Sequence, residues 1–275
     1  MVENPAELFT RLEQEFARHV QAFYPNATQR ELNHAYLGSL KRFDAMILAE
    51  HLQATKPKTI LEVGSFLGFS TRWILEISSS WGAKVVSIDP GIRHRVFDNV
   101  QSHLLSFNRA FGEQGALTVV RAFFALPSQD LTRYLYDYQT YEPKVEAAKA
   151  MQLLESVPTL AEFTEPFDFY FIDGDHSFDS TKASTELCLR PSVRMGRAAT
   201  IVVHDAKSFP DTVPAVTECV RNFHPHVGSF QVFASDADCC YSDVWQGNGF
   251  ARVRASSPTA IPCDGLAVVA VTANR

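Results

Sequence analysis

The hydrophobic positions of the chain follow two different periods, and the change from one to the other divides the sequence in two. In the first part, apolar side chains recur at helical spacing in two stretches. One begins after Asn4, a typical helix-capping residue, and the other covers roughly residues 29–54, with a break expected near Gly38. In the second part, short apolar runs alternate with helical segments. We therefore expect an N-terminal helical extension over residues 1–56 and a main domain over residues 57–275.

Five apolar runs of the main domain have the length and composition of strands that are buried on both faces. These runs are residues 59–64, 84–89, 117–122, 167–173 and 199–205. Helical patterns follow at residues 70–79, 96–111, 179–189 and 213–223. Because each strand then returns by a crossover helix, the sheet should be mostly parallel. With two later runs, 229–234 and 265–272, pairing as an antiparallel edge hairpin, the pattern predicts a Rossmann-like α/β fold of seven strands with helices on both faces.

Two connections are longer than this fold requires. Residues 130–164 form an insertion with a cluster of tyrosines followed by a helical pattern, and residues 235–264 are mostly turn-like. The tyrosines are Tyr134, Tyr136, Tyr138 and Tyr141. Long connections beyond the carboxyl ends of parallel strands commonly select the substrate or pack in a dimer. Both roles stay open for the insertion, and so does a homodimer or a larger homo-oligomer.

Charge and composition narrow the class of partner. The formal net charge of −6 provides no positive surface for a nucleic acid, so a small-molecule partner is expected. No apolar run approaches the roughly 20 residues of a membrane span, and the first residues have no signal-peptide core, so we expect a cytoplasmic protein without membrane contact. The 5 cysteines lack C-x-x-C spacing, which indicates buried thiols rather than a disulfide framework or a zinc ribbon.

The stretch ILEVGSFLGFST, residues 60–71, runs from an apolar strand through two glycines into a helix. A dinucleotide-binding loop would carry glycine two and five residues after Gly64, where this chain has Phe66 and Phe69. The lysine of a phosphate-binding P-loop is missing as well. The loop is therefore better suited to a nucleoside that has no phosphate and carries an amino-acid tail.

S-adenosylmethionine is a ligand of this kind, and nearby polar residues can be assigned to its parts. Gly64 would let the ligand approach the strand end, Glu62 would accept from its ammonium group, and Ser70 at the helix start would meet its carboxylate. Phe66 would form a wall of the loop. Asp89, at the end of the next strand, is placed to accept both ribose hydroxyls.

Four sequence motifs resemble a known enzyme group. They are LEVGSFLGFST, FYFIDGDHSFD, IVVHD and IPCDGLAVVAVT. The first looks like motif I of the class I S-adenosylmethionine-dependent methyltransferases, in the form found in metal-dependent O-methyltransferases of the catechol type. The second and third are similar to bacterial small-molecule methyltransferases, some of which act on sugar hydroxyls. The resemblance implies that Ser65 and Gly68 belong to the cofactor site and that Ala122 and Phe123 contact adenine.

The residues that could perform chemistry follow the fourth and fifth strands of the main domain. Asp173, Asp175 and His176 end the fourth strand, and His204 and Asp205 end the fifth. Because the carboxyl ends of adjacent parallel strands meet at one edge of a sheet, we expect these side chains to lie together. Methyl transfer to a hydroxyl can gain most of its rate from holding the oxygen nucleophile against the methyl group, and that nucleophile also has to lose its proton.

The resemblance also implies roles for these residues. In the families concerned, the positions matched by Asp173 and Asp205 bind a divalent metal, usually magnesium, and the position matched by His176 is the general base. Asp173 is in addition the residue best placed to contact the methionine ammonium. Asp175 is expected to orient the loop or to cap the helix that follows.

One position departs from the family pattern. Catechol-type enzymes carry asparagine after the second aspartate, where this chain has Ala206, and the sugar-modifying relatives often carry an acid before it, where this chain has His204. Either His204 is a metal ligand, which would shift the preference from magnesium toward manganese, iron or zinc, or the enzyme works without metal. The other histidines, such as His94, His103, His224 and His226, lack partner spacing and are expected at the surface.

The function predicted from these residues is S-adenosylmethionine-dependent methyl transfer to a hydroxyl of a small molecule, such as an aromatic compound, a sugar or a secondary metabolite. A metal-independent N-methyltransferase is the alternative within the same class. A nucleoside-binding regulatory protein would have the same fold without turnover. A nicotinamide-dependent oxidoreductase is disfavoured by the missing glycines.

Overall fold

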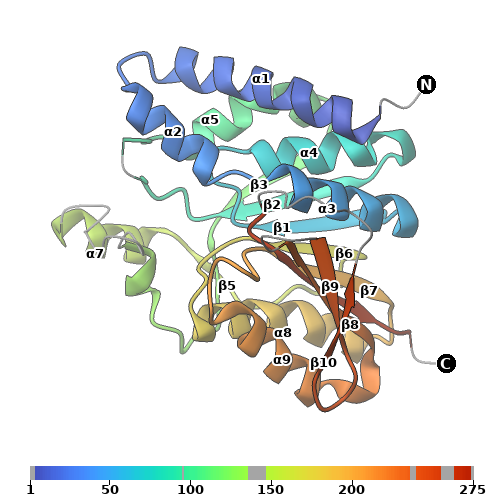
Figure 1. The fold of residues 1–275 in the computed structure, drawn as a ribbon. Coiled ribbons are helices and arrows are strands. Elements are labelled where there is room, and N and C mark those ends of the chain that lie inside the picture. The colour runs from blue at the N-terminus through green and yellow to red at the C-terminus, as the bar shows by residue number, and fades with distance from the viewer. Residues whose placement is uncertain (1–3, 95, 136–146, 236–239, 255–262, 274–275) are drawn as a thin grey trace.

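Three helices precede the sheet in the computed structural model, which describes residues 4–94, 96–135, 147–235, 240–254 and 263–273 (Figure 1). They are α1 (Pro5–Phe23), α2 (Gln29–Leu37) and α3 (Arg42–Thr55). Asn4 caps α1 by accepting from the backbone N–H of Ala6 at 2.8 Å, and Thr28 and Glu31 form a capping box on α2. The chain leaves the helical conformation between α2 and α3, which confirms the predicted break near Gly38.

The described residues form a nine-stranded mixed sheet in the order β10-β9-β8-β11-β7-β6-β1-β2-β3. Five strands are parallel, as predicted: β1 (Thr59–Val63), β2 (Lys84–Asp89), β3 (Leu117–Arg121), β6 (Phe169–Ile172) and β7 (Ala199–Val203). The antiparallel part consists of β8 (Val227–Ser235), β9 (Cys240–Trp245), β10 (Phe250–Arg254) and β11 (Leu266–Val271).

The prediction of seven strands is therefore wrong, because β9 and β10 lie within the segment 235–264 that was read as turn-like. Each of these short strands has charged or polar residues among its apolar ones, and the ion pair between Arg252 and Asp243 joins them, so they lack the continuous apolar signal of a buried strand. The predicted antiparallel pairing of the last two runs is confirmed as β8 with β11. That pair lies inside the sheet, however, with β9 and β10 extending the edge beyond it.

Helices cover both faces of the sheet (Figure 1). One face carries the N-terminal helices together with α4 (Phe69–Ser78) and α5 (Val100–Phe107), and the other carries α8 (Phe178–Arg194) and α9 (Thr212–Asn222). Adjacent strand residues supply the two faces in turn: Ile60 packs in the core with α1 and α4, and Leu61 packs in the core with α8. The helix predicted over residues 96–111 is interrupted near Asn108, after which the short α6 (Arg109–Glu113) begins.

The N-terminal helices share a core with the main domain. The Phe9 ring lies edge-on to the rings of Phe69 and Trp73, and the indole N–H of Trp73 donates to the carbonyl of Ala45 at 3.0 Å. His103 is fully buried here and not at the surface as expected, because apolar and aromatic neighbours surround it. Burial lowers the pKa of His103 to about 4.

The connection after β3 contains several short elements, of which α7 lies away from the sheet (Figure 1). They are β4 (Phe123–Phe124), the 3-10 turn Leu131–Leu135, α7 (Ala147–Ser156) and β5 (Thr159–Leu160), with β4 and β5 paired in parallel. Two further 3-10 turns span Ser79–Trp81 and His224–His226. Of the tyrosine cluster, Tyr134 is described, and Tyr136, Tyr138 and Tyr141 lie outside the described residues. Cys188, Cys219 and Cys240 are buried and Cys263 is half-buried, while Cys239 lies outside the described residues.

Candidate active site

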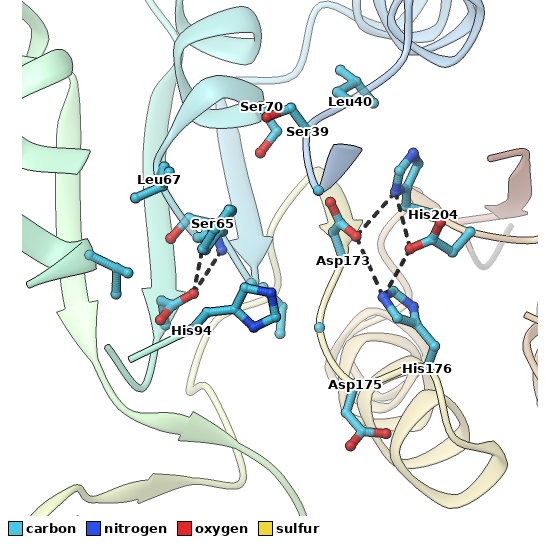
Figure 2. A pocket seen from close by; sticks show the side chains of 18 of the residues that line it. Ser39, Leu40, Ser65, Leu67, Ser70, His94, Asp173, Asp175, His176 and His204 are labelled. Carbon is cyan, nitrogen blue, oxygen red and sulfur yellow. Dashed lines mark hydrogen bonds and ion pairs between the residues drawn. The ribbon is translucent and has the colours of Figure 1, made fainter. Parts of the chain in front are cut away.

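A cavity of about 570 Å³ lies at the carboxyl edge of the parallel strands. The loops that follow β1, β2, β6 and β7 line it, and so does the connection between α2 and α3, residues 38–41. This is where ligands bind in sheets of this type, because the crossover loops diverge there. In Figure 2, Ser65 and His94 lie on one side of the cavity, and Asp173, His176 and His204 lie on the other.

The two glycines of the loop after β1 are required by the protein itself. Gly64 has φ +81°, and a Cβ at this position would lie 2.0 Å from the carbonyl oxygen of Asp173. Gly68 has φ +86°, and a Cβ there would lie 2.8 Å from the side-chain nitrogen Nδ2 of Asn108. Close packing of β1 against β6, and of α4 against α5, thus explains both residues before any ligand is considered.

Glu62 is fully buried and is not among the residues that line the cavity. Its carboxyl oxygens accept from the hydroxyls of Ser70 at 2.7 Å, Thr71 at 2.5 Å and Ser87 at 2.8 Å. Burial raises the pKa of Glu62 to about 7, although these three hydrogen bonds lower it in part. The structure therefore places Glu62 behind Ser70, which does line the cavity, rather than where it could meet an ammonium group.

Asp89 lines the cavity, and its carboxylate also organises the glycine loop. Oδ2 accepts from the backbone N–H groups of Ser65 at 3.0 Å and Phe66 at 3.1 Å, and Oδ1 accepts from that of Gly91 at 2.7 Å. These bonds support the conformation of Phe66, whose φ of +44° is unusual for a residue with a side chain.

The apolar wall beside Asp89 differs from the prediction in one residue. Ala122 lines the cavity as expected, but Phe123 does not: it is fully buried, with its ring edge-on to that of Tyr134. Phe124 and Ile92 line the cavity instead. Because side chains alternate along extended chain, Ala122 and Phe124 share a face, and this period of two could have identified Phe124 from the sequence.

Four predicted residues come together at the ends of β6 and β7 (Figure 2). Nδ1 of His204 lies 3.1 Å from Oδ1 of Asp173 and 3.5 Å from Oδ2 of Asp205. Nε2 of His176 lies 2.9 Å from Oδ2 of Asp205 and 3.9 Å from Oδ1 of Asp173. Asp205 has φ +60°, so the backbone turns sharply to direct its carboxylate at both histidines.

In this cluster the carboxylates raise the pKa of the histidines and the histidines lower the pKa of Asp205, so that the charged forms are favoured. Burial lowers the pKa of His204, but the carboxylates of Asp173 and Asp205 raise it by more, to well above the ordinary histidine value. Burial likewise lowers the pKa of His176, and Asp205 and Asp173 raise it by more. Burial raises the pKa of Asp205, and the two histidines lower it by more, so its carboxylate stays ionised.

Three ligand atoms of the cluster have the spacing that a shared metal ion requires. Those of Asp173, His204 and Asp205 all lie within 4.8 Å of one another. Two ligands at about 2.1 Å from one cation are about 3.0 Å apart at a right angle and about 3.4 Å apart in a tetrahedron. The observed 3.1 and 3.5 Å separations from Nδ1 of His204 fit this range. These residues could therefore hold a divalent cation, with His204 supplying the ligand that Ala206 cannot.

His176 does not cap the helix α8 that follows it. Ser177 is the N-cap of α8, and Asp175 accepts from the backbone N–H of Ser177 at 2.8 Å, so Asp175 orients this loop. The His176 imidazole instead stacks on the ring of Phe209, with centroids 4.4 Å apart. Its ring is thus held with Nε2 toward the two aspartates.

Asp44 also lies in this region, although no sequence pattern identifies it as a site residue. It lies in the first turn of α3, is fully buried, and accepts from the backbone N–H groups of Asp264 at 2.8 Å and Gly265 at 3.1 Å. Its Oδ2 also lies 3.6 Å from Nε2 of His204. An acid at a helix start reads as a dipole-stabilising residue, and its partners more than 150 residues away cannot be seen locally.

Comparison with known proteins agrees with this geometry. The family described as "Methyltransferase domain" matches residues 61–206, and no curated protein matches the sequence. The solved O-methyltransferase from Bacillus cereus in complex with SAH is 18% identical, with 96% of this chain and 90% of that chain covered and a TM-score of 0.50. The cofactor-bound protein Rv0187 from MTB is 17% identical, with 100% of both chains covered and a TM-score of 0.50.

These structures share the fold of this chain. Among the described residues, no helix is long and apolar enough to cross a membrane. The matched segment is more than half of the 275 residues and contains both the glycine loop and the acid–histidine cluster. The chain therefore belongs to the methyltransferase domain family and has the Rossmann-like fold of the class I methyltransferases.

Proposed function

We propose that this protein transfers the methyl group of S-adenosylmethionine to a hydroxyl of a small molecule. The observation that carries the proposal is a single cavity lined both by Asp89 with an apolar wall and by the cluster of Asp173, His176, His204 and Asp205. The first set suits a nucleoside, and the second can receive a proton from a hydroxyl and stabilise the resulting charge. The related O-methyltransferase from Bacillus cereus, solved with SAH, supports the same donor.

The donor would be held along the loops after β1, β2 and β3. Asp89 would accept from the ribose hydroxyls with the lone pairs that the loop N–H groups leave, and Ala122 and Phe124 would contact the adenine. Ser70, fixed by its hydrogen bond to Glu62, would face the carboxylate of the amino-acid tail. Asp173 would accept from the ammonium group, which also places the sulfonium beside the acidic cluster.

The transfer itself is an in-line displacement. The acceptor oxygen forms a bond to the methyl carbon, the bond from that carbon to sulfur breaks, and S-adenosylhomocysteine leaves as a neutral thioether. His176 takes the hydroxyl proton, and its contact with Asp205 stabilises the imidazolium that forms. The stacking of His176 on Phe209 keeps the ring in place during this step. Holding the two reactants in line supplies much of the remaining acceleration.

A divalent cation would fit between Asp173, His204 and Asp205, and when bound it would lower the pKa of a hydroxyl coordinated to it. The acceptor would then lie between that position and His176. Without a cation, the carboxylates of Asp173 and Asp205 pair with His176 and His204 instead, and a histidine would accept the proton only in its neutral form. Titration with magnesium and with manganese distinguishes these two forms, and manganese is included because of the histidine ligand.

The proposal is tested first by calorimetry with S-adenosylmethionine, with and without magnesium or manganese. Hydroxylated aromatic compounds and sugars are then screened by mass spectrometry for the gain of one methyl group. With a positive acceptor, His176→Asn should lower kcat by about 10²- to 10⁴-fold while leaving the affinity for the donor unchanged. His224→Asn is the matched control, because His224 is exposed and does not line the cavity. An unchanged kcat in His176→Asn would refute its role as the base.

A metal-independent N-methyltransferase is the second candidate within the family. An amine acceptor would release its proton without a strong base, so chelation and His176→Asn would both leave kcat unchanged. Binding of S-adenosylmethionine with no acceptor turned over in a broad screen would favour a nucleoside-binding protein instead.

A further inference from the structure

The buried carboxylate of Asp44 joins the N-terminal helices to the acid–histidine cluster. Its two oxygens accept from backbone N–H groups of Asp264 and Gly265, the residues that lead into β11. These two hydrogen bonds would be enough if Asp44 served only to hold residues 264–265 in place. Yet Oδ2 of Asp44 also faces Nε2 of His204 at 3.6 Å, and the side chain is fully buried.

The two ring nitrogens of His204 face different partners. Nδ1 faces Asp173 and Asp205, which line the cavity at the ends of β6 and β7. Nε2 is buried, makes no hydrogen bond to any of the described residues, and faces the carboxylate of Asp44. A buried ring N–H without an acceptor is costly, so the carboxylate of Asp44 is the group that compensates this position.

We infer that Asp44 is a positioning residue that sets the orientation and tautomer of His204 for cation binding. When a cation is bound at Nδ1, the imidazole keeps one proton, on Nε2, and the carboxylate of Asp44 beside Nε2 stabilises the ring in that form. The lone pair of Nδ1 is then directed at the space between Asp173 and Asp205. Histidine ligands of metal ions commonly donate their second N–H to a carboxylate, which also increases their basicity.

This inference rests on the cation site of the proposed function and makes it more specific. A site of one imidazole nitrogen and two carboxylate oxygens should prefer manganese or zinc over magnesium, which favours oxygen ligands. Asp44 would contribute to that preference without touching the cation or the acceptor. The helix α3 would thereby take part in the site although it lies outside the parallel strands and their loops.

The first experiment is calorimetric titration of the whole protein with MnCl₂ alone. Asp44→Asn should weaken manganese binding by about 10- to 100-fold, the usual effect of losing the carboxylate behind a histidine ligand. Asp168→Asn is the matched control, because Asp168 also accepts from two backbone N–H groups, those of Lys58 at 2.9 Å and Thr59 at 3.1 Å, and does not line the cavity. It should change the affinity by less than about 3-fold. Equal losses in the two variants, or no loss in Asp44→Asn, would overturn the inference.

A second measurement does not depend on a variant that folds. Long-range ¹H–¹⁵N spectra of the wild-type protein with zinc should show Nδ1 of His204 as the cation-bound nitrogen and the proton on Nε2. The reverse assignment, or no cation binding to the wild-type protein, would overturn the inference. Titration with S-adenosylmethionine in the same samples keeps the two proposals apart, because donor binding and methyl transfer without a cation would leave the proposed function standing.

Discussion

Replacement of Gly64 by alanine should destabilise the protein even when no ligand is present. The new Cβ would lie 2.0 Å from the carbonyl oxygen and 2.6 Å from the carbonyl carbon of Asp173, and φ at this residue is +81°. Backbone atoms cannot rotate away as a side chain can. The ends of β1 and β6 would therefore have to separate, which stretches the 2.7 Å hydrogen bond from the N–H of Asp173 to the carbonyl of Val63.

The size of the effect follows from three contributions. A left-handed φ costs a residue with a side chain about 1 kcal/mol. Overpacking costs about 1–3 kcal/mol, and loss of one backbone hydrogen bond adds about 1 kcal/mol. Gly64→Ala should thus lower the free energy of unfolding by about 3–5 kcal/mol. Gly82 offers the matched control, because its φ is +70° and a Cβ there would have no atom within 4 Å, so Gly82→Ala should cost only about 1 kcal/mol.

Urea denaturation of the ligand-free variants, followed by circular dichroism, measures this difference. The expected result is a lower midpoint for Gly64→Ala than for Gly82→Ala, with similar slopes. If the two variants were equally stable without ligand and differed only in S-adenosylmethionine affinity, the glycine would serve the ligand and not the packing of β1 on β6.

Three further predictions concern stability. The pKa of Glu62 is raised to about 7 by burial, so stability should fall as pH rises from about 4.5 to 7, by about 3 kcal/mol at most, and Glu62→Gln should remove this loss in urea titrations across that range. The pKa of His103 is lowered to about 4, so the free energy of unfolding should fall as pH decreases from about 6.5 to 4. His103→Phe should reduce this fall, and an unchanged fall between about pH 6.5 and 4 in that variant would contradict the prediction. Trp73→Phe loses the 3.0 Å hydrogen bond to Ala45 and part of a buried ring, and calorimetric melting should show a loss of about 2 kcal/mol.

The parallel half of the fold could be predicted because its strands are buried on both faces. Runs such as residues 199–203, Ala-Thr-Ile-Val-Val, are rich in apolar and β-branched residues, and this signal is local. The strands β9 and β10 gave no such signal, since the charged residues Arg252 and Asp243 interrupt their short apolar runs. The position of β11 between β7 and β8 also depends on pairing of segments that are far apart in sequence.

The candidate site was predictable where strand ends determine it. Asp173, His176, His204 and Asp205 meet because β6 and β7 are adjacent and parallel. The environment of Glu62 was not predictable in the same way, since whether a strand residue faces a cavity or three hydroxyls depends on the helix packed over it. Asp44 was missed for a related reason, because its partners Asp264 and His204 are far from it in the sequence.

The late position of β11 in the chain has a consequence for synthesis on the ribosome. Until residues 266–271 have emerged, β7 and β8 each present an unsatisfied row of backbone N–H and C=O groups to the solvent, because β11 pairs with both. The acid of α3 likewise waits for its backbone donors from the same segment. The nascent polypeptide should therefore remain incompetent for ligand capture until residues 266–271 have left the ribosome, and a chaperone that shields open strand edges would protect it during that interval.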